Sequence, residues 1–398
     1  MKIEPLCRKL PAAAVDYCEI EGDIRIEANT STIFVITPDE QISPNSTTSW
    51  TIKPYVRWYV NEYVKLWTVK IVRYSESKNN IKLKCRHDNY HTSPAILFSS
   101  GGQIGNYYHS FSDLLFPLYA TSLGFQRDVH FLASDYQGWW MNKFHEILNL
   151  LTSHPIVDID SETGRVHCYH KMVVGLKFHS DLVVDERSVA EYATGVSMQN
   201  FRQLLRDAYS LERKTAIDSR QLNSTSPRLM ILSRKRSRVI LNEDVICEAA
   251  KDLGFEVFSG EDGSTVDVFR FAEQVNSCDV LMGVHGSGLT NMVFLPDNAV
   301  LIQVLPFGEL DVIANIDYRD PTTGMNIQYL DYKISANEST LSKDYPIDHP
   351  VLTDPGSLHR QGWHAMSSVY LDNQNFTIDV VKFNSTLAQA MKLLHGIH

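Results

Sequence analysis

The second half of the chain alternates short apolar runs with amphipathic stretches, and this alternation limits the fold more than any other feature. Four apolar runs have the length of buried strands: residues 228–234, 255–258, 279–283 and 299–306. Three stretches between them repeat apolar residues at helical spacing: residues 242–254, 265–278 and 288–296. This order predicts an α/β fold with a parallel sheet covered by helices on both faces.

The first half predicts the same alternation less regularly. Strands are expected at residues 31–36, 63–74, 82–85, 128–134, 155–160 and 170–178. Helices are expected at residues 109–125, 139–153 and 197–211, with a last one at 385–397. The polar stretch 212–228 contains Pro227 and is the best candidate for a linker. Because 398 residues exceed what one hydrophobic core usually holds, two domains are expected.

Charge and hydropathy exclude several classes of protein. The formal net charge is −10, so a protein that coats nucleic acid or an anionic membrane is not expected. No apolar run reaches the roughly 18 residues that a transmembrane helix requires. The residues after Met1 also lack the apolar core of a signal peptide.

Two weaker features point to a lumenal protein. Acceptor sequences for N-glycosylation begin at Asn29, Asn45, Asn223, Asn337, Asn375 and Asn384. Cys7 and Cys18 stand close together in a polar segment, where a disulfide is reasonable in an oxidising compartment. Cys247 and Cys278 lie in apolar patterns that fit buried thiols better. No cysteine or histidine cluster has the spacing of a zinc site, so no metal is expected.

The phrase GVHGSGLTN, residues 283–291, follows one of the predicted strands and opens the next helix. Ligands of doubly wound sheets bind where a strand ends and a helix begins, because helix N-termini attract anions. Gly286, Ser287 and Gly288 therefore predict a phosphate cradle, to which His285 and the first-turn residues Thr290 and Asn291 add polar donors. A tight turn that merely needs glycine is the alternative, and the histidine before it favours the ligand.

A second anion-friendly loop, SRKRSR, follows the first strand of the same predicted sheet. Because strand ends of a parallel sheet converge, Arg234 and Arg238 are expected to face the glycine turn and clamp a diphosphate. A solvated loop is the ordinary explanation of one charge run. Because two anion-friendly loops are predicted on the same edge of the sheet, each strengthens the prediction of an anion-binding site there.

The third cluster is SSGGQIGNYYHSFSD, residues 99–113. Asn106 is placed to cap a helix on which His109 and Asp113 stand four residues apart, on one face. A carboxylate beside an imidazole can orient it as a general base. From spacing alone, a surface His–Asp pair after a glycine-rich turn is the better explanation.

These clusters, in this order, resemble glycosyltransferase family 61. The resemblance covers nearly the whole chain and is carried by FSSGGQIGNYYHSFSDLLFPLY, SRKRSRVILNE, KDLGFEV, GVHGSGLTNMVFLP and LIQVLPFG. The phrases NESTLSKDYPIDHP and NQNFTIDVVKF resemble its plant xylan-decorating branch. The chain departs from the family pattern at Gln103 and Ile104, around His109, and at Ser287, which stands where alanine is common.

The resemblance implies an inverting enzyme of the GT-B type, with two Rossmann-like domains and a central cleft. The expected domains are an acceptor side at residues 1–215, a nucleotide-sugar side at 216–374, and a final helix in 375–398 that crosses back to the first domain. The implied partners are a UDP-sugar donor and a xylan acceptor. The implied location is the Golgi lumen, behind an N-terminal membrane anchor that this chain does not include.

The roles that the resemblance implies fall into two sets. The donor would be held by Arg234, Arg238, Asn242, His285, Gly286, Ser287, Gly288, Thr290 and Asn291. On the acceptor and sugar side are Gly105, Asn106 and Glu309, and the base is His109 or Asp113, or His109 oriented by Asp113. No cofactor is strictly required, and Mn²⁺ is an optional stimulant.

The sugar is the least determined part, because the recognisable residues would contact the diphosphate. Xylose from UDP-xylose, added β-1,2 to xylan, is the first expectation. Arabinofuranose from UDP-arabinofuranose, added α-1,3, is the second. Two other classes remain: a different nucleotide-binding enzyme, and a non-catalytic polysaccharide-binding relative, which the retained His109 and Asp113 disfavour.

Overall fold

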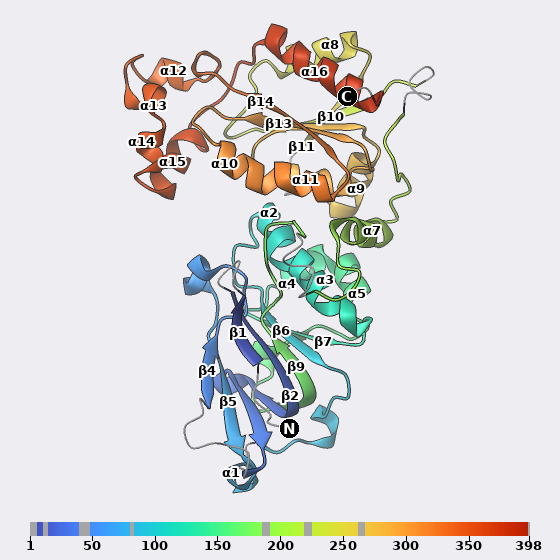
Figure 1. Ribbon diagram of the computed structural model, residues 1–398, viewed down its shortest axis with the longest axis vertical. Helices are drawn as coiled ribbons and strands as arrows, with labels where there is room; N and C mark the ends of the chain where they lie inside the picture. Colours follow the sequence, from blue (N-terminus) through green and yellow to red (C-terminus); the bar gives the residue numbers. More distant parts are fainter. Residues whose placement is uncertain are drawn as a thin grey trace. The chain divides into compact units, whose positions relative to one another are not determined.

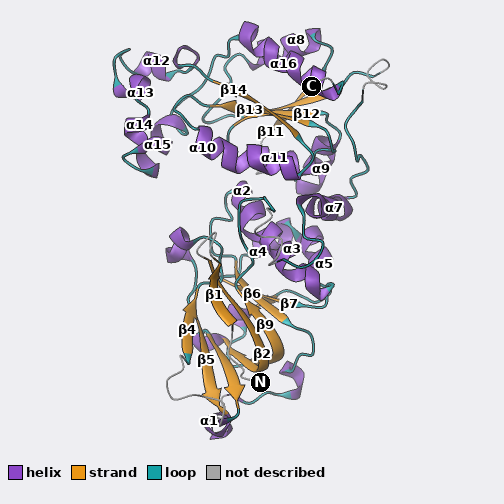
Figure 2. Ribbon diagram, in the orientation of Figure 1, coloured by secondary structure: helices purple, strands orange, loops and turns teal. Residues whose placement is uncertain are grey.

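The computed structural model describes residues 6–10, 15–39, 48–79, 83–184, 192–218, 225–261 and 267–396. The chain divides into two compact units, Met1–Ser197 and Met198–His398 (Figure 1). Each unit contains one β-sheet with helices packed around it (Figure 2). The mixed α/β class predicted from the sequence is therefore confirmed.

The first unit is built on a mixed sheet, nine-stranded within the described residues, with the order β4-β5-β3-β2-β9-β6-β7-β8 and with β1 beside β2. Its strands are β1 (Leu6–Leu10), β2 (Val15–Glu27), β3 (Thr32–Thr37), β4 (Ser49–Ile52), β5 (Trp67–Arg73), β6 (Ala95–Ser99), β7 (His130–Ser134), β8 (Val157–Asp158) and β9 (Val166–Val174). Strands β9, β6, β7 and β8 are parallel, as in a Rossmann-like sheet. The long strand β2 pairs antiparallel with β1, β3 and β9, so only part of this sheet has that character.

Helices of the first unit follow the parallel strands. They are α1 (Tyr74–Asn79), α2 (Tyr107–His109), the π-helix η6 (Ser110–Leu115), α3 (Phe116–Ser122), α4 (Gly138–Lys143) and α5 (His145–Leu151). Short 3-10 helices are η1 (Ala28–Thr30), η3 (Trp58–Tyr63), η5 (His87–Asn89), η7 (Leu123–Phe125) and η8 (Ile159–Ser161). All five residues of β6 are buried, which explains its uninterrupted apolar sequence before the polar SSGGQ. The loop after β6 leads directly into α2 and η6, which carry His109 and Asp113.

The second unit is a fully parallel five-stranded sheet, as described, in the order β11-β10-β12-β13-β14. Its strands are β10 (Arg228–Ser233), β11 (Glu256–Glu261), β12 (Val280–Val284), β13 (Val300–Leu305) and β14 (Gln328–Lys333). In chain order this is 2-1-3-4-5, a doubly wound topology whose switch point lies between β10 and β12. Ligands of such sheets bind at the carboxyl ends of the two strands at that point.

Helices surround the second sheet. They are α7 (Met198–Tyr209), α8 (Glu243–Asp252), α9 (Val268–Asn276), the 3-10 helix η9 (Ser287–Phe294), α10 (Asp311–Ala314), the π-helix η10 (Asn315–Arg319), α11 (Asp320–Gly324), the 3-10 helix η11 (Ala336–Glu338), α12 (Leu341–Asp344), α13 (Pro350–Thr353), α14 (Gly356–His359), α15 (Trp363–Tyr370) and α16 (Val380–Leu394). Four strands and the helices α8 and α9 match the prediction. The predicted helix 288–296 is a 3-10 helix, and β14 lies in a stretch with no visible period.

The units divide before α7, whereas the predicted boundary at 215/216 falls after it. The reason is Arg202 on α7, whose buried guanidinium donates to Asp297 Oδ1 at 2.8 Å and to the carbonyls of Leu295 and Met325. These contacts tie α7 to the second unit. The final helix α16 packs on α8, β13 and β14 of the second unit.

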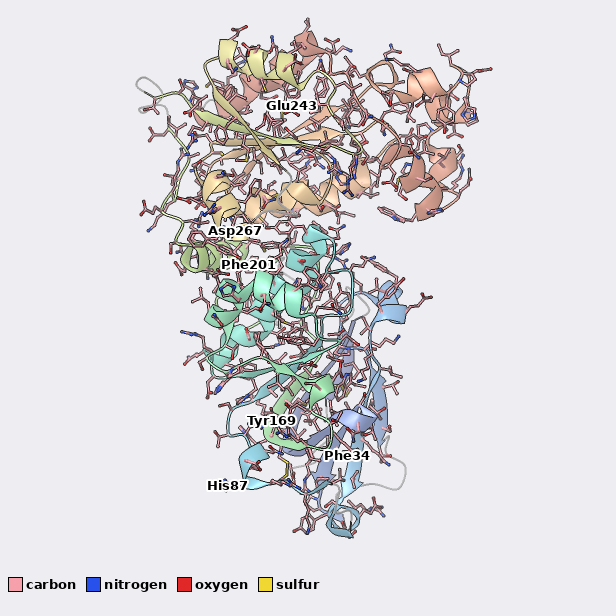
Figure 3. The ribbon with its side chains drawn as sticks, turned by 180° about the vertical axis from the view of Figure 1, so that it is seen from behind. Phe34, His87, Tyr169, Phe201, Glu243 and Asp267 are labelled. Atoms are coloured by element: carbon pink, nitrogen blue, oxygen red, sulfur yellow. A yellow bond between two sulfur atoms is a disulfide. The ribbon has the colours of Figure 1, made fainter. Side chains whose placement is uncertain are left out.

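Two disulfides stand in the first unit, Cys7–Cys18 and Cys85–Cys168. The first joins the pair that the sequence suggested, and the second was not anticipated; it lies next to the labelled Tyr169 (Figure 3). Cys247 and Cys278 are free, in agreement with their apolar surroundings. The predicted strand at 82–85 is wrong, because Leu83–Cys85 form no strand and Cys85 is held by Cys168 instead.

Candidate functional site

The two predicted anion-binding loops meet at the switch point of the second sheet. The basic loop follows β10 and His285 follows β12. Arg238 Nη1 donates to the His285 carbonyl oxygen at 2.6 Å. A Cβ atom added to Gly286 would lie 2.8 Å from Arg234 Nη1 and 3.2 Å from Arg238 Nη1. Glycine is therefore what allows both guanidinium groups to approach the backbone at this turn.

The basic loop is held from behind by residues far away in the sequence. Arg238 has a left-handed backbone, with φ of +57°, and its N–H donates to the Gln374 carbonyl at 2.7 Å. Ile378 N donates to Asn242 Oδ1 and Asn242 Nδ2 donates to the Ile378 carbonyl, both at 2.9 Å. Asn242 occupies the N-cap position of α8 without making a side-chain cap bond. Its amide therefore anchors the loop to Ile378.

The first turn of α8 joins the ends of the neighbouring strands. Glu243, labelled in Figure 3, accepts hydrogen bonds from Ser233 Oγ at the end of β10 and from Ser259 Oγ at 3.2 Å. This carboxylate stands in the first turn of α8, at the positive end of the helix dipole, where an acidic side chain is stabilising. Hydrogen bonds thus hold both ends of the basic loop, at Ser233 and at Asn242.

His285 is a buried, neutral imidazole. Its exposed fraction is 5 %, and burial, with the positive charges of Arg238 and Arg234, lowers its pKa to about 3. Gln303 Nε2 lies 2.8 Å from Nδ1, and Asp317 Oδ2 lies 3.9 Å from Nε2. At any working pH this side chain can donate one N–H without carrying charge.

The glycine turn leads into η9, with Gly286 as its N-cap. The first amides of a helix have no carbonyl partner within it, and here they belong to Ser287 and Gly288. Thr290 and Asn291 are fully buried, and Asn291 Nδ2 donates to the Gly288 carbonyl at 2.8 Å. Their side chains shape the turn from inside the unit. The groups of this turn that could bind an anion are therefore the Gly286–Gly288 backbone and the two arginines.

Glu309 stands beyond the carboxyl end of β13 and is exposed. Its backbone is left-handed, with φ of +59°. The preceding Gly308 lies so close to the Tyr370 ring that an added Cβ would be 2.4 Å away. The turn is fixed by this contact, and Glu309 is the polar side chain that it presents.

The first unit brings His109 and Asp113 together. His109 Nδ1 lies 2.9 Å from Asp113 Oδ2. Because a carboxylate only accepts, Nδ1 carries the proton and Nε2 keeps a free lone pair. His109 is partly exposed, with 17 % of its side chain accessible, whereas the Asp113 side chain is fully buried. The pair presents the basic nitrogen of an oriented imidazole.

Asp113 is saturated with donors. Its oxygens also accept from Tyr55 Oη at 2.8 Å, from Arg57 Nη2 at 2.8 Å and Nε at 3.0 Å, and from Ser112 Oγ at 2.6 Å. Burial alone would raise the pKa of this carboxyl, but the hydrogen bond from His109 and the charge of Arg57 outweigh it and lower the pKa to about 2. Asp113 is thus an ionised acceptor that orients its neighbours, and it is poorly suited to take a proton itself.

The carboxylate sits in a π-helix, where the backbone bulges by one residue per turn. Residues Ser110–Leu115 form this element, and π-helical turns are frequent at functional sites. Asp317, near His285, lies in the other π-helix, Asn315–Arg319. In each unit, therefore, a carboxylate carried by a π-helix lies near a histidine.

The glycine-rich loop before His109 makes room for Tyr55. A Cβ atom on Gly102 would lie 2.1 Å from the Tyr55 ring, and Gln103 N donates to Tyr55 Oη at 3.1 Å. Asn106 caps α2 as predicted, accepting from Tyr108 N at 2.9 Å. Gly105 has open space around it and is exposed.

Sequence reasoning missed the partners of both histidines. Tyr55, Arg57 and Asp181 hold the Asp113 side of the first unit, where Arg57 bridges Asp113 and Asp181. Gln303 and Tyr329 hold His285 in the second. One signal was available, since Gln303 is a polar residue in the middle of the apolar run 299–306. Arg57 had none, because its partners lie 56 and 124 residues away.

Three acceptor sequences for N-glycosylation present an exposed asparagine: Asn29, Asn337 and Asn384. Asn375 is half-buried, and its Oδ1 accepts from Val239 N at 2.9 Å. Asn45 and Asn223 lie outside the described residues. Within the described ranges, no helix is both long and apolar enough to cross a bilayer. Nor do three or more His, Cys, Asp or Glu side chains gather there as a metal site would require.

An arginine-lined glycine turn at the switch point of a doubly wound sheet suits an enzyme that binds an anionic ligand, and the oriented histidine of the first unit suits acid–base chemistry. Comparison with known proteins agrees. The family model described as Glycosyltransferase 61 matches residues 107–302. The chain belongs to this glycosyltransferase family.

Its relatives include several named plant enzymes. A rice (Oryza sativa subsp. japonica) protein named β-1,2-xylosyltransferase XYXT1 is 40 % identical over 395 residues, covering 95 % of this chain and 82 % of that protein. The rice α-1,3-arabinosyltransferase XAT2 is 34 % identical and covers 98 % of this chain; the chain spans 65 % of its length. The xylan glycosyltransferase MUCI21 of Arabidopsis thaliana is 32 % identical over a region that covers 94 % of this chain and 77 % of that protein.

Proposed function

We propose that this chain is an inverting xylan pentosyltransferase that uses a UDP-sugar, with UDP-xylose and a β-1,2 linkage as the first choice. The observation that carries the donor half is the convergence of Arg234 and Arg238 on Gly286 at the switch point. The acceptor half rests on the ordered His109–Asp113 pair. The pentose and the xylan backbone come from the named activities of the relatives.

The attacking hydroxyl of the acceptor would lose its proton to His109. Nδ1 is committed to Asp113, so Nε2 is the nitrogen that accepts the proton as the hydroxyl attacks the anomeric carbon. The imidazolium formed would be stabilised by the ionised Asp113, which Arg57 and Tyr55 hold in place. Asp113 is therefore the orienting group, and His109 the base.

The departing UDP would be stabilised in the second unit. Arg234 and Arg238 supply two cations, and the Ser287 and Gly288 amides supply neutral donors. His285 would add a neutral N–H donor. These groups neutralise developing diphosphate charge without a metal being strictly required, and Mn²⁺ would act as a stimulant.

The proposal includes a GT-B arrangement, in which the two units close on a central cleft and Glu309 lies near the sugar. It also includes a Golgi-lumen location, supported by the disulfides and by the exposed glycosylation sequences. Arabinofuranosyl transfer from UDP-arabinofuranose is the second candidate, favoured by the similarity to XAT2.

The test is a donor panel. The protein is incubated with xylo-oligosaccharides and UDP-xylose, UDP-arabinofuranose, UDP-glucose or UDP-N-acetylglucosamine, and the products are read by mass and linkage. We expect pentose transfer with release of UDP. Tight binding of xylo-oligosaccharides without transfer from any donor would instead make this chain a polysaccharide-binding relative.

A further inference from the structure

Gln303 is an uncommon residue at its position. It lies within β13, paired with Gly283 of β12 and Asp331 of β14, and its neighbours in the strand are apolar. Its side chain is fully buried. Burying an amide costs free energy unless its hydrogen bonds are made, so its partners decide what it is for.

Both ends of the amide are engaged. Tyr329 Oη, from β14, donates to Gln303 Oε1 at 2.7 Å. Gln303 Nε2 then faces His285 Nδ1 at 2.8 Å. Strands β14 and β13 and the turn after β12 thus contribute one residue each to a chain of hydrogen bonds that ends on the imidazole at the switch point.

This chain selects one protonation state of His285. An amide NH₂ group only donates, so Nδ1 must accept and the ring proton must reside on Nε2. The Asp317 carboxylate, 3.9 Å from Nε2, only accepts and favours the same tautomer. Protonation of Nδ1 would set a ring N–H against the amide N–H and place a cation beside Arg238, whose Nη1 binds the His285 carbonyl.

We propose that Gln303 is a positioning residue that locks His285 as the neutral Nε2–H tautomer, so that this histidine donates to the diphosphate and never acts as a base. Tyr329 acts through Gln303 by fixing the orientation of the amide. This inference rests on the proposed function for the identity of the ligand, but the tautomer itself is a property of the free protein. The two histidines then have opposite roles, because His109 is protonated on Nδ1 and His285 on Nε2.

The tautomer can be measured directly. The protein is labelled with ¹⁵N-histidine, and two-bond ¹⁵N–¹H spectra are recorded without nucleotide, with His285→Asn used to assign the signal. We expect the Nε2–H pattern, unchanged between about pH 8 and pH 5, where a free histidine would titrate. An Nδ1–H pattern, or an imidazolium within that range, would overturn the inference while leaving UDP-sugar transfer intact.

Variants test the role of Gln303. In Gln303→Glu a carboxylate faces Nδ1 and can only accept a hydrogen bond, which favours protonation of Nδ1. We therefore expect the spectrum to change to the doubly protonated ring and the Kd for UDP to become pH-dependent. Tyr329→Phe keeps the Gln303 amide but removes the hydroxyl that fixes its orientation. We expect UDP binding to weaken by roughly threefold to tenfold, with the protein still folded. An unchanged His285 spectrum in folded Gln303→Glu, or an unchanged Kd in Tyr329→Phe, would show that Gln303 does not position this ring. If the wild-type tautomer is as expected but UDP does not bind, the proposed function is wrong, whereas the role of Gln303 in fixing the His285 tautomer still holds.

Discussion

Replacing Asp113 with asparagine should remove most of the activity while leaving the protein folded. The asparagine amide can place its NH₂ group either toward Arg57 or toward His109. Toward Arg57 it would meet two N–H groups that now lie 2.8 and 3.0 Å from Oδ1. Toward His109 it meets one, at Nδ1, 2.9 Å from Oδ2. We expect the second orientation, because it leaves the buried guanidinium with its acceptor.

In that orientation His109 must accept at Nδ1 and carry its proton on Nε2. The nitrogen that faces the acceptor hydroxyl is then no longer a base. Loss of general-base catalysis typically costs about 10²- to 10⁴-fold in kcat. The lost charge-assisted hydrogen bond should destabilise the unit by about 1 to 3 kcal/mol.

The assay is UDP release with a saturating xylo-oligosaccharide, accompanied by thermal unfolding. The matched control is Asp181→Asn, since Asp181 pairs with Nη1 and Nη2 of the same Arg57, whereas the hydrogen bond to His109 Nδ1 comes from Asp113. It should lower the unfolding temperature with less than about a tenfold loss of kcat. Near-normal turnover in folded Asp113→Asn, or equal losses in the two variants, would refute the orienting role.

Three further predictions follow from the described contacts. Arg238→Ala should raise the Kd for UDP by roughly 10- to 100-fold, measured by calorimetry, whereas the exposed Arg236 in the same loop should tolerate alanine; equal effects would refute the clamp. Gly286→Ala should weaken UDP binding, because the new Cβ displaces the ends of two flexible arginines, and should also lower the unfolding temperature, because an L side chain is strained at the φ of +154° found there; unchanged affinity would contradict this. Burial and neighbouring imidazoles lower the pKa of His130 from 6.5 to about 4. As the pH falls, His130 is therefore protonated in the unfolded chain before it is protonated in the folded protein. The free energy of unfolding should reach its full value above about pH 6.5 and fall as the pH is lowered toward 4. Thermal unfolding of His130→Gln should show a weaker dependence on pH; an equal slope would exclude His130 as the cause.

Most of the second sheet could be predicted because β10, β12 and β13 are almost entirely buried and read as apolar runs. The edge strand β11 is only partly buried and was visible through the short apolar run 255–258. Strand β14 could not, because it alternates buried and exposed residues, as in Leu330, Asp331 and Tyr332, within a long stretch without period. The same holds for the short helices α10 to α15, which are too brief for helical spacing to show. The first sheet is mixed because β2 pairs antiparallel on both sides, and pairing partners far apart in the chain leave no local signal.

In the candidate site, too, local features could be predicted from the sequence and long-range contacts could not. Local features such as the glycine turn, the basic loop and the His109–Asp113 spacing were readable, because each lies within a few residues. Asn242 was expected at the donor, but its amide is occupied by Ile378, which lies 136 residues later. The networks behind each histidine are likewise long-range, so sequence showed the histidines but not which nitrogen each one offers.

The central claim is that this family member transfers a pentose from a UDP-sugar onto xylan. The most direct measurement is the linkage of the product formed from UDP-xylose and a xylo-oligosaccharide, with Asp113→Asn as the inactive control. The account predicts a single added xylose in β-1,2 linkage, absent from the control. Transfer of a different class of sugar by the wild-type protein, or no transfer from any UDP-pentose, would contradict it.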